Sequence, residues 1–376
     1  MNQSLSAAKA AKKDEFYTQY IDIQKEVEAY LEYDPDTFRS KVIYCNCDDP
    51  FESNFFKYFA ANFNRLGLKK LITTSYDGSP IAGQQTSLFP EFDQADNKRR
   101  KPHGASFAIE IEEVTDINGD GATDIEDVKL FLEHNPHSRK ALKGGGDFRS
   151  DECVELLKSA DIVVTNPPFS LFREFVALLM ECDKKFLIIG NQSALTTSEI
   201  FPLIRENKMW LGVDNGGTKW FEVKDDYDIK TESRKKTENG KKYFSMGSIM
   251  WYTNLDHGRR HQELPLMTMA DNLKFNKKLS GKTEYDAYDN YVAIEIPTYK
   301  SIPTDYEGVM GVPITFVDKY NPDQFEIVGS DYEVKQGLHP ELVRDNWDGK
   351  LDRGYIGGKR MFARILIRHR KKRIKH

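Results

Sequence analysis

The chain has 376 residues, of which 39% are hydrophobic and 30% are charged. This length accommodates one large α/β domain and a second module, and the composition is that of a globular protein in water. No run of about 18 apolar residues occurs, so the sequence excludes a membrane-spanning helix.

The charges are unevenly distributed along the chain. The net charge of −5 argues weakly against binding to nucleic acid, but residues 359–376 contain nine Lys and Arg, two His and no acid. Such a basic tail favours contact with phosphates, and its candidate DNA-binding residues are Lys371, Lys372 and Arg373. A frayed, solvated terminus is the alternative interpretation.

The N-terminus and the cysteines give no sign of export. Residues 1–13 lack the apolar core of a signal peptide and are expected to form a disordered arm. The four cysteines have the spacing of neither a disulfide framework nor a zinc site. They favour a reducing compartment, so we expect the protein to be cytoplasmic.

Residues 14–212 predict alternating helices and strands. Apolar residues at helical spacing indicate helices over 21–31, 51–66, 128–134, 150–159, 171–182 and 197–207. Short apolar runs indicate strands over 41–44, 69–75, 107–114, 162–164 and 185–189. The alternation predicts an α/β fold with a mostly parallel, doubly wound sheet, which a long loop or insert at 78–143 interrupts.

The pattern changes after about residue 212. Residues 213–376 mix short strands with aromatic-rich loops and predict a mixed α+β region, with one strand over 243–254 and a last strand ahead of the basic tail. Arg259, Arg260 and His261 are further candidates for DNA contact, although a solvated loop explains them equally well.

The segment Ile162–Phe169 carries the strongest functional motif. Its apolar start predicts a buried strand, which must end at Asn166-Pro-Pro-Phe because prolines cannot donate to a β-ladder. The result is a stiff loop at the carboxyl end of a strand, which is where open α/β sheets bind ligands. A proline-terminated strand without any chemistry is the alternative.

This loop suits methyl transfer to an exocyclic amine. The side-chain oxygen of Asn166 and the backbone carbonyl of Pro167 can accept hydrogen bonds from one NH2 group, which directs its lone pair toward an electrophile. Phe169 offers a flat face for stacking of a planar base. Asn166, Pro167, Pro168 and Phe169 are therefore the candidate catalytic residues, in a motif typical of amino-methyltransferases that use S-adenosylmethionine.

Acidic residues follow each of the first two predicted strands. The turn Cys45–Pro50 contains Asp48 and Asp49, which suit the ammonium group of a cofactor. Asp77 follows the second strand, where a carboxylate accepts hydrogen bonds from ribose hydroxyls in dinucleotide-binding folds.

Longer stretches of the chain resemble the EcoRI-type DNA adenine-N6 methyltransferases, in the same order and over nearly the whole length. They are Asp14–Tyr20, Tyr44–Pro50, Ser53–Phe59, Gly146–Ser150, Asp161–Arg173, Lys184–Ile189 and Met310–Phe316. The resemblance implies a Rossmann-like catalytic domain over 14–212 and a target-recognition region over 213–376. It also implies double-stranded DNA as substrate, GAATTC as a candidate target, and a cognate restriction endonuclease as a partner.

The resemblance further implies a set of cofactor-binding residues. They are Phe16, Tyr17, Thr18, Asn46, Asp48, Asp49, Asp77, Asp147, Phe148 and Asn166. Within this set, Asp147 and Phe148 are expected to hold the adenine of S-adenosylmethionine. The first strand is not followed by the glycine-rich loop that is common in other methyltransferases.

Three other functions are alternatives to this one. A glutamine-N5 protein methyltransferase uses a similar loop, but it needs neither a basic tail nor a large second module. A cytosine-N4 DNA methyltransferase is closer. A DNA-binding protein with a dead pocket has no support, because Asn166 and both prolines are intact.

The insert contains two further motifs. Residues 116–127 have the spacing of a calcium loop, with an empty acidic turn as the alternative; the candidate ligands are Asp116, Asn118, Asp120, Ala122, Asp124 and Asp127. Gln85–Phe89 resembles the pentapeptide by which bacterial proteins bind the replication sliding clamp. A loop that Leu88 and Phe89 fix to the enzyme's own surface is the alternative.

Overall fold

The computed structural model describes residues 17–47, 53–75, 106–120, 125–134, 139–223, 227 and 231–370. The chain divides into two compact units. The first unit comprises the residues up to Gln192 together with Gly212–Leu255, and the second comprises Ser193–Leu211 and the residues from Asp256 onward. Residues 212–255 thus belong to the first unit, whereas the sequence suggests a boundary near residue 212. The predicted arm at 1–13 lies outside the described residues.

A mixed β-sheet forms the centre of the first unit. Its strands have the spatial order β4-β3-β2-β1-β5-β6-β11. The bounds are β1 (Val42–Cys45), β2 (Lys70–Thr74), β3 (Phe107–Ile111), β4 (Arg139–Ala141), β5 (Ile162–Thr165), β6 (Lys185–Asn191) and β11 (Ile249–Thr253). The predicted α/β class is confirmed. The sheet is mixed rather than mostly parallel, because β3 and β11 run antiparallel to β2 and β6.

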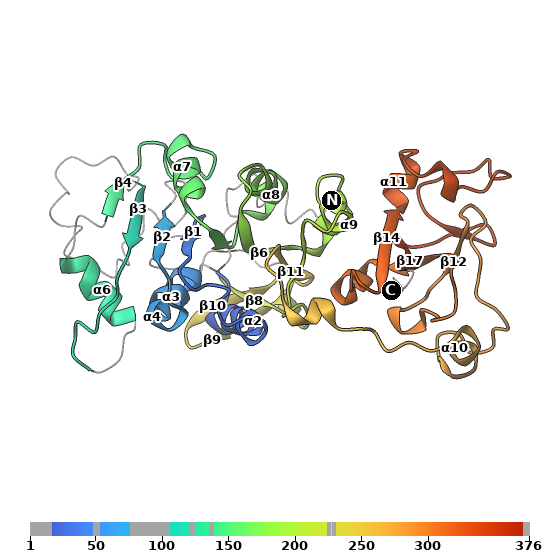
Figure 1. The fold of residues 1–376 in the computed structure, drawn as a ribbon, viewed down its shortest axis with the longest axis horizontal. Coiled ribbons are helices and arrows are strands. Elements are labelled where there is room, and N and C mark those ends of the chain that lie inside the picture. Colours follow the sequence, from blue (N-terminus) through green and yellow to red (C-terminus); the bar gives the residue numbers. More distant parts are fainter. Residues whose placement is uncertain are drawn as a thin grey trace, which may run out of the picture. The chain divides into compact units, whose positions relative to one another are not determined.

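Helices cover both faces of this sheet. Figure 1 shows α7 and α8 on one side and α2, α3 and α4 on the other. The bounds are α2 (Tyr20–Tyr33), α3 (Asn54–Ala61), α4 (Phe63–Leu66), α6 (Ile125–His134), α7 (Asp151–Ser159) and α8 (Phe172–Glu181). Every residue of β1 and β5 is buried between these layers, as expected for strands that are covered on both faces.

The helix expected over 51–66 is two helices in the described part of that range. Ser53 begins α3 by accepting a hydrogen bond from the N–H of Phe56 at 3.4 Å. Asn62 separates α3 from α4, and its side chain donates to the carbonyl oxygen of Tyr58 at 2.8 Å. The side chain of Asn62 thus satisfies a carbonyl group at the end of α3.

Residues 220–253 contain more strands than the sequence predicts. The strand expected over 243–254 is two, β10 (Lys241–Ser245) and β11, because Gly247 and Ser248 turn the chain with φ values of 53° and 54°. The polar segment ahead of them contains β8 (Trp220–Val223) and β9 (Lys235–Glu238). These strands form a separate sheet in the order β8-β10-β9, and Asn239-Gly240 provides the left-handed hairpin turn.

Glu26 on α2 fixes the segment that leads to β8. Its carboxylate accepts hydrogen bonds from the N–H groups of Val213 at 2.8 Å and Asp214 at 2.6 Å. Gly212 lies so close that a Cβ atom would collide with this carboxylate. The buried Lys219 lies 2.5 Å from Asp214. Complete burial raises the pKa of Glu26 to about 7, although the backbone N–H groups favour its charged form.

The second unit has a four-stranded sheet in the order β12-β13-β17-β14. Its strands are β12 (Ala293–Glu295), β13 (Val309–Pro313), β14 (Phe325–Ser330) and β17 (Arg364–His369). The other helices of this unit are α9 (Phe201–Arg205), α10 (Met269–Phe275) and α11 (Asp331–Lys335), together with the 3-10 helices η5 (Gly258–His261), η6 (Tyr299–Ser301), η7 (Ile314–Lys319) and η8 (Pro340–Leu342). Its remaining strands are the two-residue strands β7 (Trp210–Leu211), β15 (Tyr355–Ile356) and β16 (Lys359–Arg360). Buried Arg364 on β17 pairs with buried Glu295 on β12 at 2.5 Å. In the described part of the chain, no helix has the length and apolar character needed to cross a membrane.

Replacement of Glu26 by Gln is expected to change how stability depends on pH. The carboxyl group has a pKa of about 7 when folded and 4.5 as its ordinary value, so the folded state binds more protons between these values. The free energy of unfolding of the wild type should therefore fall as the pH rises from 4.5 to 7, by about 3 kcal/mol relative to Glu26→Gln. Urea unfolding at pH 5 and pH 8 measures this difference, and a difference that is the same at both pH values contradicts it.

Candidate active site

The carboxyl ends of β1 and β5 define the site. The two strands are neighbours, with β2 on the far side of β1 and β6 on the far side of β5. The connections from β1 and β5 therefore lead in opposite directions, which makes a topological switch point where open α/β sheets bind ligands. Ile43 pairs with Ile162 and Tyr44 with Val163, so the two strands end side by side. The Oγ1 atom of Thr165 donates a hydrogen bond to the backbone oxygen of Asn46.

The Asn166-Pro-Pro-Phe segment follows β5 directly. Asn166 and Pro167 are buried, whereas Pro168 and Phe169 are half-buried. A short 3-10 helix begins at Phe169, and the N–H of Leu171 donates to the oxygen of Pro168 at 2.9 Å. This turn fixes the loop between β5 and α8.

Some buried side-chain oxygen atoms of the first unit have no hydrogen-bond partner. Asn46 Oδ1 and Thr18 Oγ1 are two of them among the described residues. Asn46 follows β1, and Thr18 is linked to the start of α3 because Asn54 donates to its backbone oxygen at 2.7 Å. Buried acceptors without a donor are costly. The amine and hydroxyl groups of S-adenosylmethionine are donors of the kind that these two oxygens need, so the residues fit the cofactor.

The turn before α7 presents Asp147 and Phe148. Gly145 and Gly146 make the turn with φ values of 69° and 72°. Phe148 is buried, with its ring centroid 5.1 Å from that of Phe175 on α8. The guanidinium of Arg149 donates to both carboxylate oxygens of Asp147, at 2.9 and 2.7 Å. These hydrogen bonds lower the pKa of Asp147, so its carboxylate is an ionised acceptor at neutral pH.

The start of the described chain pairs with the small three-stranded sheet β8-β10-β9. Tyr17 and Glu222 on β8 exchange two backbone hydrogen bonds, each of 3.2 Å. The ring of Phe169 lies 6.5 Å from that of Phe221 on β8, at an interplanar angle of 86°. Phe16, Asp48, Asp49 and Asp77 lie outside the described residues.

Sequence reasoning missed several residues that build this site. Thr165 donates a hydrogen bond to the backbone of Asn46, and Asn54 donates one to the backbone of Thr18. Arg149 forms an ion pair with Asp147. Thr165 and Arg149 adjoin predicted motifs, so their proximity in sequence was an available signal. Phe221 lies in a polar stretch without any motif, so the sequence contained no signal for its contact with Phe169.

A groove of about 520 Å³ lies elsewhere in the first unit. Charged residues of β2, β3, β4 and α7 line it, among them Lys70, Glu110, Lys140 and Glu152. It contains none of the residues predicted to bind the cofactor or the target base, so it is distinct from the candidate active site.

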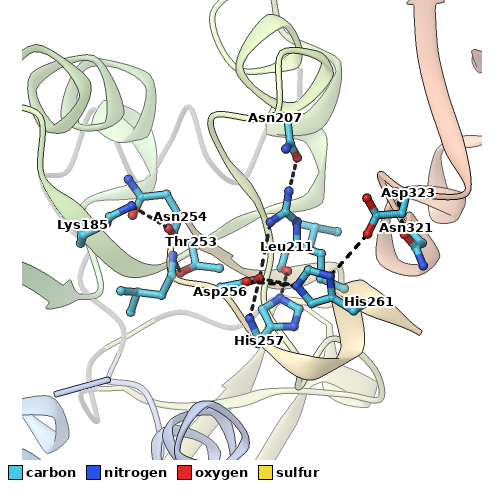
Figure 2. A network of polar contacts seen from close by, with 12 residues as sticks. Lys185, Asn207, Leu211, Thr253, Asn254, Asp256, His257, His261, Asn321 and Asp323 are labelled. Carbon is cyan, nitrogen blue, oxygen red and sulfur yellow. Dashed lines mark hydrogen bonds and ion pairs between the residues drawn. The ribbon is translucent and has the colours of Figure 1, made fainter. Parts of the chain in front are cut away.

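The basic residues of η5 form contacts within the second unit. Figure 2 shows His261 between Asp256 and Asp323, with its nitrogen atoms 2.8 and 3.7 Å from their carboxylates. The buried Arg260 has its guanidinium 3.6 Å from the ring centroid of Trp210. Arg259 pairs with Asp318 at 2.5 Å. These contacts give the three residues a structural role, and their contact with DNA stays a prediction.

The acidic loop is hydrogen-bonded to its own backbone. The buried carboxylate of Asp127 accepts from the N–H groups of Ile117 and Asn118 at 2.7 and 3.2 Å, and Asp116 accepts from Gly119 at 2.6 Å. Asn118 and Asp120 also bond to each other, while Ala122 and Asp124 lie outside the described residues. No cluster of three or more acidic, His or Cys residues suited to a metal occurs in the described part of the chain.

Comparisons with known proteins identify the family. Residues 4–370 match the sequence model of the family described as "Adenine-specific methyltransferase EcoRI". The chain is 40% identical to the Type II methyltransferase M.EcoRI of Escherichia coli, over 98% of this chain and 97% of that protein. The chain belongs to this family of adenine-specific methyltransferases. It is a DNA methyltransferase specific for adenine, as predicted from the sequence.

Two further Type II methyltransferases are similar to this chain. The Type II methyltransferase M.MgeORF184P of Mycoplasma genitalium is 35% identical over 96% of this chain and 97% of its own length. M.MpnI of Mycoplasma pneumoniae, also a Type II methyltransferase, is 33% identical over the same shares of both chains. No solved structure is detectably similar to this methyltransferase.

Substitution of Asn46 tests whether its buried oxygen binds the cofactor. Asn46→Ala removes the acceptor and should raise the Kd for S-adenosylmethionine by about tenfold, the scale of one hydrogen bond to a charged group. Asn46→Asp retains an acceptor and should bind with a Kd near that of the wild type. Calorimetry measures both values. Equal weakening by the two substitutions would mean that the acceptor is not what the cofactor needs.

Proposed function

We propose that this methyltransferase binds S-adenosylmethionine at the carboxyl end of β1 and presents the target adenine to it at the Asn166–Phe169 loop. The single observation that carries the proposal is the side-by-side ending of β1 and β5 at the switch point. The arrangement supports a Rossmann-like catalytic unit, in which the cofactor and the target base meet across neighbouring strand ends.

The proposed cofactor site uses residues from three segments. Thr18 and Asn46 accept hydrogen bonds from the methionine part, with Asp48 and Asp49 close to Asn46 in sequence. Asp147 accepts from the adenine part while Phe148 supports the turn. When bound, S-adenosylmethionine supplies an electrophilic methyl group, so the protein has only to position a nucleophile and exclude water.

The proposed role of Asn166 and Pro167 is to orient the adenine amine. Its two N–H groups donate to Asn166 Oδ1 and to the backbone oxygen of Pro167, which directs the nitrogen lone pair at the methyl carbon. Phe169 stacks on the base after it leaves the duplex. Neither a metal nor a strong base is required, because the amine loses its proton to solvent once it carries the methyl group.

The second unit is proposed to supply DNA recognition, together with the basic tail. GAATTC is the first target to test, and a cognate restriction endonuclease is the corresponding partner. Three further predictions stand from the sequence: a cytoplasmic location, calcium binding by the acidic loop, and clamp binding by Gln85–Phe89. The last two motifs lie wholly or partly outside the described residues.

Methyl transfer from S-adenosylmethionine with a tritiated methyl group tests the proposal. Asn166→Ala should lower kcat on duplex DNA by roughly 100-fold or more, the scale of losing one hydrogen bond that is aimed at developing charge. Binding of DNA should remain near that of the wild type. Asn166→Asp keeps an acceptor and should retain more activity than Asn166→Ala. Near-normal turnover by Asn166→Ala would refute the role of the loop.

The proposed role of the basic tail has a separate test. Replacement of Lys371, Lys372 and Arg373 by Gln should weaken binding to all DNA sequences alike. The slope of log affinity against log salt should become shallower by about 0.9 for each phosphate that the tail no longer neutralises. Fluorescence anisotropy at several salt concentrations measures the slope, and an unchanged slope would mean that the tail does not bind DNA.

A further inference from the structure

The strand β8 connects the two halves of the proposed site. Phe221 on this strand contacts the ring of Phe169, which follows β5. The next residue, Glu222, is paired through its backbone with Tyr17 in the N-terminal cofactor segment. A single strand thus touches both the residue expected to stack on the target base and a segment expected to hold the cofactor.

The strand β8 is paired along one edge and at one residue of the other edge. On one edge it pairs with β10, where Phe221 faces Phe244 and Glu222 faces Tyr243. Lys241 on β10 also contacts the carboxylate of Glu222 at 3.0 Å. Tyr17 bonds to the other edge at Glu222. Two-sided pairing makes β8 a rigid support rather than a mobile edge strand.

The preceding residues are anchored as well. Lys219, one residue before β8, is only 5% exposed and lies 2.5 Å from Asp214. The N–H of Asp214 in turn bonds to Glu26 on α2. The core of the first unit thus holds the start of β8 in place.

The contact between Phe221 and Phe169 constrains a ring plane. The last torsion of a Phe side chain has a broad energy well, so a neighbouring ring can narrow the range of planes that the phenyl ring adopts. Phe221 is buried, 1% exposed, and its ring is nearly perpendicular to that of Phe169. A perpendicular pair at 6.5 Å is a favourable arrangement of two rings. This contact restricts the orientation of the half-buried Phe169.

We propose that Phe221 is a positioning residue for the target adenine: it holds the ring of Phe169 in the plane on which the base stacks. The pairing of Glu222 with Tyr17 sets this support relative to the cofactor segment. The inference rests on the proposed role of the Asn166–Phe169 loop and assigns one more residue to it. The competing explanation is that Phe221 only fills the core.

A double-mutant cycle distinguishes the two explanations. Phe221→Leu keeps an apolar side chain but removes the ring, and it should lower kcat on duplex DNA about 3–10-fold. Fluorescence of 2-aminopurine at the target position should report altered stacking, while the Kd for S-adenosylmethionine stays unchanged. In the Phe169→Leu background, Phe221→Leu should have little further effect on kcat, because Phe221 acts through that ring.

The matched control is Phe244→Leu. Phe244 pairs with Phe221 across β8 and β10 and packs against Tyr227, so its loss weakens the same small sheet. Phe244→Leu should reduce the melting temperature as Phe221→Leu does and should leave kcat near that of the wild type. Phe221→Met provides a second ringless variant if the Leu variant does not fold.

Two results would overturn the inference. Independent, multiplicative effects of Phe221→Leu and Phe169→Leu on kcat would mean that Phe221 does not act through Phe169. Equal losses of kcat for Phe221→Leu and Phe244→Leu would indicate a role in stability alone. Near-normal turnover by Asn166→Ala would refute the proposed function and this inference together, whereas the first two results leave the proposed function intact.

Discussion

The parallel pairing of β1 with β5 is the interaction on which the rest of the site depends. Asp161, just before β5, accepts a hydrogen bond from the N–H of Val42 at 2.7 Å, and its own N–H donates to the oxygen of Val42 at 2.9 Å. These bonds fix the register at the start of both strands. The register then brings their carboxyl ends to the same edge of the sheet, so Asn46 and the Asn166 loop follow neighbouring strand ends although about 120 residues separate them.

Polar anchors determine where the small β8-β10-β9 sheet meets this site. Glu26 and Lys219 are buried in the first unit and hold the segment that leads to β8. Burial of a carboxylate is costly, and the backbone donors offset this cost only in part, because burial raises the pKa of Glu26 to about 7. We infer that this cost is retained because it secures the strand next to Phe169.

The sequence predicts those helices and strands whose apolar pattern lies within the element itself. The apolar runs of β1, β5 and β6 and the helical pattern of α2 appear close to the expected positions. The strand β8 was missed because four residues in a charged stretch give little periodicity and pair with a distant strand. Likewise, Asp318, which pairs with Arg259, and Asp323, the more distant of the two acids near His261, lie about 60 residues away in the chain, where no local pattern reveals them.

A crystal structure of the enzyme with an unreactive analogue of S-adenosylmethionine is the most direct test of the central claim, that the switch point is the cofactor site. We expect the amino-acid part of the analogue to contact Asn46 and its adenine to contact Asp147, beside the Asn166 loop. An analogue found instead in the charged groove that Lys140 and Glu152 line would contradict it.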